Sequence, residues 1–554
     1  MRKTLLISCL LIAATTQAQL LYVNNADGTF QAIDTKKSEG ITFDAEQRLV
    51  RFFMEDGVTS QFATDKVNNI AAASNNGTEL TYDLNPTVAF DTDDAVGFHE
   101  EIEKIITDEL IDESGDFVEN YIPERTITIT FSATGVKTSS LPSDITATIN
   151  GGHIVINSAR SKTAYRVTGT CADGSLKIYS TKKFQIMLQN LNLTNPTGPA
   201  INIQSGKTVY MTLLNGTNNT LCDGATYSAP IIGSNGEEED QKGTLFSEGQ
   251  LIIDGYTNGT GILNVTSYGG HAICSDDYIK VRGGNINILS AAKDGFRTKE
   301  KFFIGRTADY APNITINATS NGIECTEGTL TIEAGKLDIT SGGEAIKVEY
   351  EENDPTITPD AYIEGGYIKL TTTGEKSSAI QTTRNYTQSG GIIEATVNGN
   401  GSKIINCDGT ATFSGGKLTG FVNGTVTNDE TSAGGIKCAG NIEISNCTIA
   451  IDCKGKGAKG INCDKDITVN SGNVTLLATA EDYTAISDDK KSRAITTSSI
   501  TVNGGTVVAK AYDNALSSNV AININGGAVN AYSTNSIALE IEATQTGGWL
   551  LTKD

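Results

Sequence analysis

A repeated pattern of short apolar triplets constrains the fold of this chain more than any other feature. The stretch from Gly435 to Ala478 contains the pattern twice, with apolar residues two apart in three successive short segments. A period of two predicts β-strands with one buried face, because successive side chains in a strand point to opposite sides. Three short strands that recur at about 25 residues predict one coil of a solenoid.

The first strand of the pattern can be followed in both directions. Its apolar marker residue recurs at Ile273, Phe296, Ile323, Ile346, Ile380, Ile405, Ile436, Ile461, Ile495 and Leu516. Glycine pairs such as Gly390-Gly391 and Gly504-Gly505 suit the sharp corners, because glycine tolerates a left-handed backbone. One coil alone cannot bury its inner face, so the coils must stack. The sequence therefore predicts an all-β fold, a right-handed parallel β-helix.

The chain is expected to have four segments. Residues 1–18 form a signal peptide, 19–75 a small N-terminal β unit, 76–144 a linker and N-terminal cap, and 145–554 the parallel β-helix. Within the cap, apolar residues at helical spacing between residues 99 and 111 favour a helix. Such a segment is expected to cover the open N-terminal end of the β-helix.

The first residues have the pattern of an export signal. Arg2 and Lys3 precede an apolar run, and small residues end at Ala18. We expect a protein that is secreted or held at the cell surface, with the periplasm as another destination. No other stretch is long and apolar enough to span a membrane.

Charge limits the partners. The formal net charge is −23, which argues against nucleic acid and anionic membranes. A polyanion could bind only at a local basic strip or through metal cations. We expect a monomer.

The cysteines indicate buried thiols rather than a disulfide framework. Nine remain after residue 18, an odd number that excludes complete pairing. Four of them occupy the inner position of the first strand: Cys325, Cys407, Cys438 and Cys463. Small thiols at that position are expected to pack as hydrophobic side chains.

Several motifs give the chain a family resemblance. They lie at residues 151–156, 165–169, 174–178, 191–201, 215–224, 272–277 and 293–296. Together they resemble the secreted carbohydrate-binding domain-containing proteins of clostridia and Bacteroides-type bacteria, over roughly residues 145–540. The resemblance implies a β-helix akin to pectate lyases, binding of acidic plant-type polysaccharide, calcium on the wall, and a mainly non-catalytic role. Lys293 departs from the family pattern, which has an aspartate at that place.

Alignment of the coils gives candidate site residues. Stacked positions lie one strand spacing apart, so oxygen atoms from neighbouring coils can converge on one ion. Calcium takes six to eight hard oxygen ligands. The best such set is Asp276, Asp277, Asp294, Asn321, Glu324 and Glu344. Alternatively, Arg297, Glu324 and Lys347 form a surface salt ladder, because their charges alternate.

Candidate sugar-contacting residues are the cations Arg297 and Lys347 and the rings Tyr268 and Tyr278. Trp549, the single tryptophan, either plugs the C-terminal end of the solenoid or stacks on sugar. The acidic run at residues 237–240 is expected to be a solvated loop.

These features favour non-catalytic binding of an acidic, polygalacturonate-like polysaccharide, assisted by calcium. One alternative is a calcium-dependent polysaccharide lyase, with Arg297 or Lys347 as the base. Another is an adhesin or surface scaffold with a protein partner.

Overall fold

The computed structural model describes residues 20–72, 75–94, 117–233, 236–255, 259–305, 311–350, 352, 354–485 and 489–554. It divides into unit 1, Met1–Ala89 with Ala411–Asp554, and unit 2, Phe90–Thr410. Apart from the 3-10 helix η1 (Val118–Asn120), the named elements are strands, which confirms the all-β class. The predicted signal peptide and the predicted helix at 99–111 lie outside the described residues.

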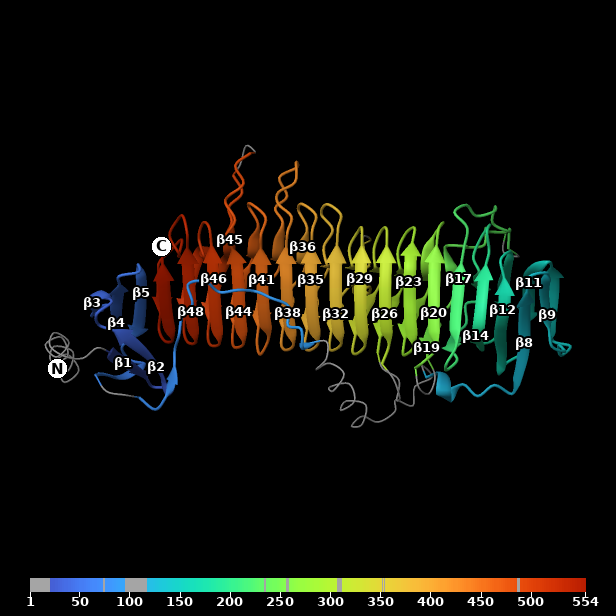
Figure 1. The fold of residues 1–554 in the computed structure, drawn as a ribbon, viewed down its shortest axis with the longest axis horizontal. Helices are drawn as coiled ribbons and strands as arrows, with labels where there is room; N and C mark the ends of the chain where they lie inside the picture. Colours follow the sequence, from blue (N-terminus) through green and yellow to red (C-terminus); the bar gives the residue numbers. More distant parts are fainter. Residues whose placement is uncertain are drawn as a thin grey trace. The chain divides into compact units, whose positions relative to one another are not determined.

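Unit 2 is a β-solenoid whose strands form three columns of parallel neighbours. Figure 1 shows one of these columns from the front. The first column contains β11 (Gly152–Ser158), β13 (Gly174–Ser180), β15 (Ile201–Gln204), β18 (Gly243–Ser247), β21 (His271–Ser275), β24 (Phe296–Thr298), β27 (Ile323–Cys325), β30 (Ile346–Val348), β33 (Ile380–Thr382) and β36 (Lys403–Cys407). The second contains β16 (Val209–Leu213), β19 (Leu251–Asp254), β22 (Tyr278–Val281), β25 (Lys301–Ile304), β28 (Thr329–Ile332), β31 (Ala361–Ile363) and β34 (Tyr386–Gln388). The third contains β17 (Asn218–Cys222), β20 (Ile262–Ser267), β23 (Asn285–Ala291), β26 (Asn313–Ala318), β29 (Lys336–Ser341), β32 (Tyr367–Thr372) and β35 (Ile392–Val397).

The predicted inner positions are in register. Phe296 pairs with both Ile273 and Ile323, and the row continues through Ile346 and Ile380. These five side chains are fully buried. The repeat in the sequence therefore corresponds to the stacking of coils, as predicted.

The N-terminal end of unit 2 begins earlier than the predicted β-helix boundary at residue 145. β8 (Arg125–Ser132) already pairs in parallel with β12 (Thr163–Cys171), which pairs with β14 (Phe184–Thr194). Antiparallel partners bound this end: β9 (Gly135–Thr138) pairs with β8, and β10 (Ile145–Asn150) pairs with β11. Antiparallel hairpins thus terminate the parallel columns here.

Unit 1 contains its own solenoid columns. The first column contains β39 (Gly434–Cys438) and β42 (Lys459–Cys463). The second contains β37 (Ala411–Phe413), β40 (Ile442–Ile444), β43 (Asp466–Val469) and β49 (Ala543–Gln545). The long strands β45 (Arg493–Val502) and β47 (Leu516–Ile524) contribute to both columns. The third comprises β38 (Lys417–Val422), β41 (Thr448–Cys453), β44 (Asn473–Ala478), β46 (Thr506–Ala511), β48 (Ala528–Ser533) and β50 (Trp549–Lys553). At the corner before β46, Gly505 has φ +77, a conformation that glycine adopts readily.

The small N-terminal β unit packs against the C-terminal strand within unit 1. β5 (Val58–Ala63) pairs antiparallel with β50 and continues into β4 (Leu49–Met54) and β3 (Ser38–Asp44). A second sheet contains β1 (Leu20–Asn25), β2 (Thr29–Asp34), β6 (Val67–Ala71) and β7 (Thr78–Glu79). The two ends of the chain therefore share one β-layer, which sequence reasoning did not predict.

Trp549 belongs to this junction. Its ring stacks on Phe62 with 6.4 Å between centroids, and its Nε1 donates a hydrogen bond to Ser60 Oγ at 2.8 Å. The side chain is 1% exposed, so it plugs the end of the solenoid and cannot stack on sugar. Of the two predicted roles, packing is correct.

The cysteine prediction is confirmed. All nine cysteines of the described chain are free, and Cys325, Cys407, Cys438 and Cys463 are buried. Cys438 and Cys463 stand in register on adjacent strands. They pack as small apolar side chains.

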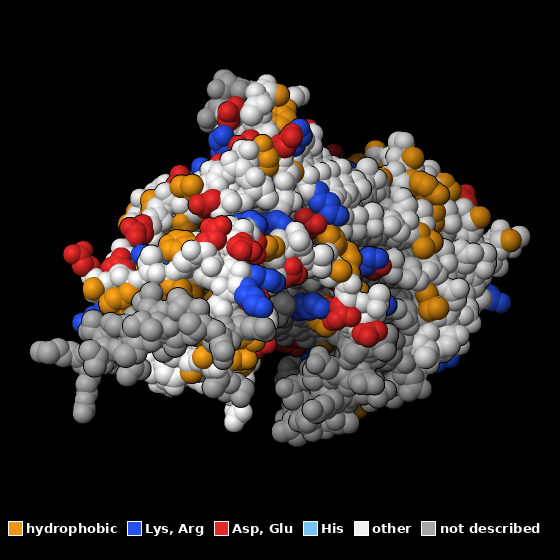
Figure 2. Space-filling view, turned by 60° about the vertical axis from the view of Figure 1, so that its left-hand side comes forward, with side chains coloured by type: hydrophobic (Ala, Val, Ile, Leu, Met, Phe, Trp, Pro, Cys, Tyr) orange, Lys and Arg blue, Asp and Glu red, His pale blue; other side chains and the backbone are white. Residues whose placement is uncertain are grey.

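Charged side chains of both signs are interspersed on the face drawn in Figure 2. The net charge of −23 is therefore not visible there as one continuous acidic surface. Within the described residues, no helix reaches the length and apolarity that a membrane crossing demands.

Candidate functional site

The outer face of the first column in unit 2 carries one continuous row of side chains. The row runs in register through Lys177, Asn202, Phe246, Cys274, Arg297, Glu324 and Lys347. Each lies beside an inward-pointing residue, because strand side chains alternate. Neighbours in the row lie about 4.8 Å apart along the column. This row is the surface on which the site is built.

A long insertion between β17 and β18, residues 223–242, folds onto the start of this row. Glu239 lies 2.8 Å from Lys177 Nζ and accepts a hydrogen bond from Tyr179 Oη at 2.7 Å. The Glu239 side chain is only 11% exposed. The backbone oxygen of Asp240 accepts a hydrogen bond from Gln204 Nε2 at 2.9 Å. The expectation of a solvated loop at 237–240 is therefore wrong for Glu239, because two first-column side chains neutralise and bind it.

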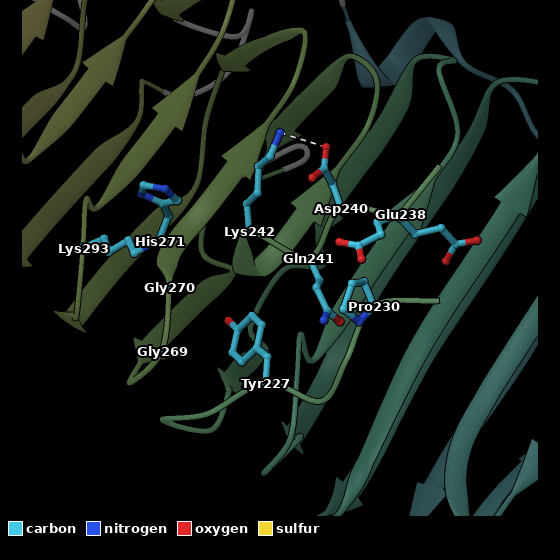
Figure 3. A pocket seen from close by; sticks show the side chains of 11 residues that line it. Tyr227, Pro230, Glu238, Asp240, Gln241, Lys242, Gly269, Gly270, His271 and Lys293 are labelled. Atoms are coloured by element: carbon cyan, nitrogen blue, oxygen red, sulfur yellow. Dashed lines mark ion pairs between the residues drawn. The ribbon is translucent and has the colours of Figure 1, made fainter. Parts of the chain in front are cut away.

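The insertion and the next coils enclose a polar cleft of about 370 Å³ (Figure 3). It is lined by Tyr227, Pro230, Glu238, Glu239, Asp240, Gln241, Lys242, Gly269, Gly270, His271 and Lys293. His271 and Lys293 lie on one side, and Glu238 and Pro230 lie on the opposite side. Lys293 is exposed and forms no ion pair with any residue that the structure describes. The cleft thus offers an unneutralised ammonium group to a ligand.

Tyr268 stands beside the cleft on the turn that carries Gly269 and Gly270. Buried Asp223 holds this turn by accepting hydrogen bonds from the Ser267 hydroxyl at 2.6 Å and from the Tyr268 amide. Asp223 also accepts a hydrogen bond from the Tyr227 hydroxyl. Burial, followed by this hydrogen bond, raises the pKa of Tyr227. The Tyr268 side chain is 59% exposed. A fixed turn therefore presents an aromatic ring to solvent next to the cleft.

His271 begins a chain of bonds at the start of the first-column strands. His271 Nδ1 lies 2.9 Å from Asp294 Oδ2, and Asp294 Oδ1 accepts the Asn321 amide at 2.9 Å. Asn321 Oδ1 in turn accepts the Glu344 amide at 3.0 Å. Burial alone would raise the pKa of Asp294, but the bonds from His271 and Asn321 hold it below its usual value. The side chains of Asp294 and Asn321 thus each accept a hydrogen bond from a backbone amide of the next coil.

The predicted sugar-contacting cations lie in a salt ladder. Arg297 Nε donates to Glu324 Oε2 at 3.0 Å, and Lys347 Nζ lies 3.6 Å from Glu324 Oε1 and 2.7 Å from Glu349. Burial raises the pKa of Glu324, and the two cations oppose this shift. The side chains whose alternating charges predicted a salt ladder therefore do form a salt ladder. A role of Arg297 and Lys347 in sugar binding stays a prediction.

The six predicted calcium ligands are divided among three places. Asp294, Asn321 and Glu344 belong to the series of bonds that begins at His271, and Asn321 Nδ2 also donates a hydrogen bond to Glu324 Oε1 at 3.0 Å. Protein groups therefore occupy both oxygens of Asp294 and of Glu324. Asp277 accepts the Tyr278 amide at 2.8 Å. Asp276 lies apart from these, beside the insertion. The six do not form one ligand set.

Asp276 instead joins a group of three carboxylates. Oxygen atoms of Asp240, Glu248 and Asp276 lie within 4.8 Å of one another. Lys242 Nζ lies 2.6 Å from Asp276 and 2.9 Å from Asp240. Burial, followed by the charges of Asp276 and Asp240, raises the pKa of Glu248 to about 6. Because carboxylate oxygens are the ligands that calcium takes, this group fits calcium chemically, with Lys242 as the competing cation.

Tyr278 lies elsewhere. It belongs to the second column and packs with Val118, Tyr121, Tyr210 and Ile252. Lys280 Nζ lies 4.6 Å from its ring centroid. Neither predicted tyrosine is among the lining residues, but Tyr268 directly precedes Gly269, which lines the cleft.

Sequence reasoning missed most of the cleft. Tyr227, Lys242 and His271 in the lining were not singled out, nor were Lys177 and Tyr179, which hold the insertion. Residues 223–242 interrupt the repeat, and their folding onto the column cannot be derived from the periodicity. A usable signal was the interruption itself, since binding residues concentrate on loops held by a rigid scaffold.

Comparisons with known proteins identify the family of this chain. A family model described as carbohydrate-binding domain-containing protein matches residues 150–482 and 456–536. No curated protein matches the chain. A solved structure, the polysaccharide lyase-like protein from C. thermocellum in a gadolinium derivative, is 21% identical, with a TM-score of 0.38. That match covers 52% of this chain and 97% of the other. Since the family model spans more than half of the residues, the chain belongs to the family of carbohydrate-binding domain-containing proteins.

Proposed function

We propose that this protein binds an acidic, polygalacturonate-like polysaccharide without cleaving it, in the cleft beside the 223–242 insertion. One observation carries the proposal: the exposed Lys293 ammonium lines the cleft, and the exposed ring of Tyr268 directly precedes the lining residue Gly269. A uronate unit has a carboxylate for the first and an apolar ring face for the second. Family membership supports a carbohydrate ligand.

The net charge of the protein explains why a divalent cation would assist binding of the polysaccharide. A chain of net charge −23 repels a polyanion, and the repulsion falls when cations lie between them. Asp240, Glu248 and Asp276 would hold calcium, which would supply positive charge to the polymer carboxylates. Lys242 would then leave the carboxylates and remain available to the ligand.

The handedness of the β-helix, the monomeric state and the location of the protein belong to the same proposal. Parallel pairing of strands in three columns supports a right-handed parallel β-helix, since crossovers between parallel strands are nearly always right-handed. The expected export signal at residues 1–18 supports a protein that is secreted or displayed on the cell surface, and we propose that it acts there as a monomer.

The test is binding of the protein to polygalacturonate with calcium and then with chelator, while new unsaturated chain ends are followed. We expect calcium-dependent binding without new ends. Lys293→Met and Tyr268→Ala should each weaken binding roughly tenfold, the loss of one charged or stacking contact. Lys299→Met is the matched control, because Lys299 lies outside the cleft and pairs with Glu327 at 3.2 Å.

Two results would overturn the proposal. Steady formation of unsaturated ends would make the protein a lyase. Binding that is unchanged in both cleft variants would place the ligand on another surface. The two residues expected as the base of a lyase, Arg297 and Lys347, are both engaged by carboxylates.

A further inference from the structure

The corner between the first and second columns of unit 2 changes the sign of its charge along the solenoid. In three successive coils it carries lysines: Lys162 before β12, Lys182 and Lys183 before β14, and Lys207 before β16. We call these four lysines the basic corner. In the coils that follow, acidic residues predominate at the same corner: Glu248, Asp276, Asp277, Glu300 and Glu327.

The register of the strands places the lysines of the basic corner side by side. Lys162 and Lys183 each lie two residues before a pair of register partners in β12 and β14. Lys182 and Lys207 lie two residues before register partners in β14 and β16. Neighbouring strands of the column are about 4.8 Å apart. Four ammonium groups on three coils therefore follow one edge of the solenoid.

A buried tyrosine fixes the backbone that carries these lysines. The Tyr121 hydroxyl donates a hydrogen bond shared by the carbonyl oxygens of Lys183, at 3.1 Å, and Thr163, at 3.3 Å. Its ring stacks on Tyr210 of β16, with 4.9 Å between centroids. One side chain thus contacts all three coils at this corner, so the spacing of the lysines is set by packed structure.

The charges of the basic corner are largely unneutralised. Lys182, Lys183 and Lys207 are exposed, and none has a carboxylate partner among the residues that the structure describes. Lys162 lies 3.0 Å from Glu124, but both side chains are about three-fifths exposed, and such a pair is weak. Residues 125–222 contain nine lysines and arginines against two acidic residues, whereas the whole chain has 42 against 65. The net charge of the protein therefore does not describe this end of unit 2.

We infer that the basic corner binds the anionic groups of an acidic polysaccharide directly, without a metal ion. Each coil offers an ammonium group at a regular spacing along a rigid edge, which suits a polymer that carries charge on successive sugar units. Single exposed contacts of this kind are weak, but several on one polymer act together. The inference rests on the proposed function for the nature of the ligand alone.

The basic corner also continues toward the carboxylate group proposed to hold calcium. Glu248 stands at the same corner on the coil that follows Lys207, since β16 pairs with β19. Oxygen atoms of Asp240, Glu248 and Asp276 lie within 4.8 Å of one another. One polymer chain can therefore contact lysines directly on the first coils and calcium on the next.

The test is titration of the full-length protein with polygalacturonate in chelator at low ionic strength. The matched probe is the fully methyl-esterified polymer, which has the same backbone and no charge. We expect weak binding of polygalacturonate that falls as salt is added, because salt screens exposed charges, and much weaker binding of the ester. Equal binding of the two polymers, or no binding of polygalacturonate in chelator, would overturn the inference.

Paired substitutions locate the binding surface. Lys183→Gln combined with Lys207→Gln should weaken binding in chelator roughly tenfold, because two charge-assisted contacts are lost. Lys137→Gln combined with Lys465→Gln removes the same charge from exposed positions outside the basic corner and should leave binding nearly unchanged. An equal loss in both double variants would mean that overall charge, and not the basic corner, attracts the polymer.

Addition of calcium separates this inference from the proposed function. Binding that appears with calcium and has no component in chelator would overturn the inference and leave the proposed function standing. Binding in chelator that depends on Lys183 and Lys207, but that calcium does not strengthen, would support the inference and contradict the calcium-assisted part of the proposed function.

Discussion

The first columns of unit 2 and unit 1 have the same inner face and different outer faces. Inside, Ile323 and Ile346 in unit 2 correspond to Ile436 and Ile461 in unit 1, and all four are buried. Outside, unit 2 carries the ladder of Arg297, Glu324 and Lys347, whereas unit 1 carries Lys437, Asn462, Thr496 and Ser517. The inner face specifies the coil, and the outer face and insertions are free to carry binding.

If this comparison holds, the largest effects come from the inner face and are equal in the two units. Ile323→Ala and Ile461→Ala should each lower the free energy of unfolding by about 2–5 kcal/mol, because each leaves a cavity in a close-packed core. Urea unfolding followed by circular dichroism measures both. A loss below about 1 kcal/mol at one site only would show that the two cores differ.

The next effect concerns the insertion at residues 223–242 of unit 2. Glu239→Gln removes the charge that Lys177 and Tyr179 hold, and should weaken docking of the insertion by about 2 kcal/mol. Hydrogen exchange at residues 228–242 should then accelerate. Glu238→Gln is the control, since Glu238 lines the cleft without these bonds. Equal exchange in both variants would mean that Glu239 does not anchor the insertion.

These two predictions separate what the sequence could and could not reveal. Ile273, Phe296 and Ile323 were predictable, because burial of one strand face repeats with every coil. The contact of Lys177 with Glu239 was not, because an insertion follows no period. Likewise, pairing of β5 with β50 joins opposite ends of the chain, and a local pattern carries no trace of it.

The candidate site was predicted less well than the fold. Coil alignment placed Arg297, Glu324 and Lys347 in one row, and they are in one row. It also grouped Asp276 with Asp294 as calcium ligands, whereas Asp276 faces Lys242 and Asp294 faces His271. Register shows which backbones are neighbours, but hydrogen-bond partners decide where each carboxylate turns.

A smaller effect is expected from pH in the carboxylate group of unit 2. The pKa of Glu248 is raised from 4.5 to about 6, so the folded state binds a proton more tightly than the unfolded state. Stability from this group is present at low pH and is lost as pH rises through 4.5 to 6. The shift corresponds to about 2 kcal/mol, which partial exposure to solvent reduces to about 1 kcal/mol.

Glu248→Gln should therefore stabilise the calcium-free protein at pH 7 by about 1 kcal/mol and flatten the dependence of Tm on pH in that window. Thermal unfolding across pH, in chelator, measures this. A steeper dependence in the variant would contradict the assignment. The first column of unit 1 should show no counterpart, which sharpens the comparison.

The smallest effect is expected at exposed charge pairs on other faces. Lys369 lies 3.6 Å from Asp338, and both side chains are more than two-fifths exposed. Lys369→Met should change the free energy of unfolding by less than about 0.5 kcal/mol. Arg297→Met, which leaves the partly buried Glu324 with one cation fewer, should cost more in the same urea experiment. Equal costs would mean that the ladder is an ordinary solvated surface.

The most direct test of the central claim is hydrogen exchange of the full-length protein saturated with polygalacturonate in calcium. The account predicts slower exchange at residues 227–242 and 268–271, which frame the cleft, and little change on the third column of unit 2. Binding of the polymer without protection of either cleft segment would contradict it.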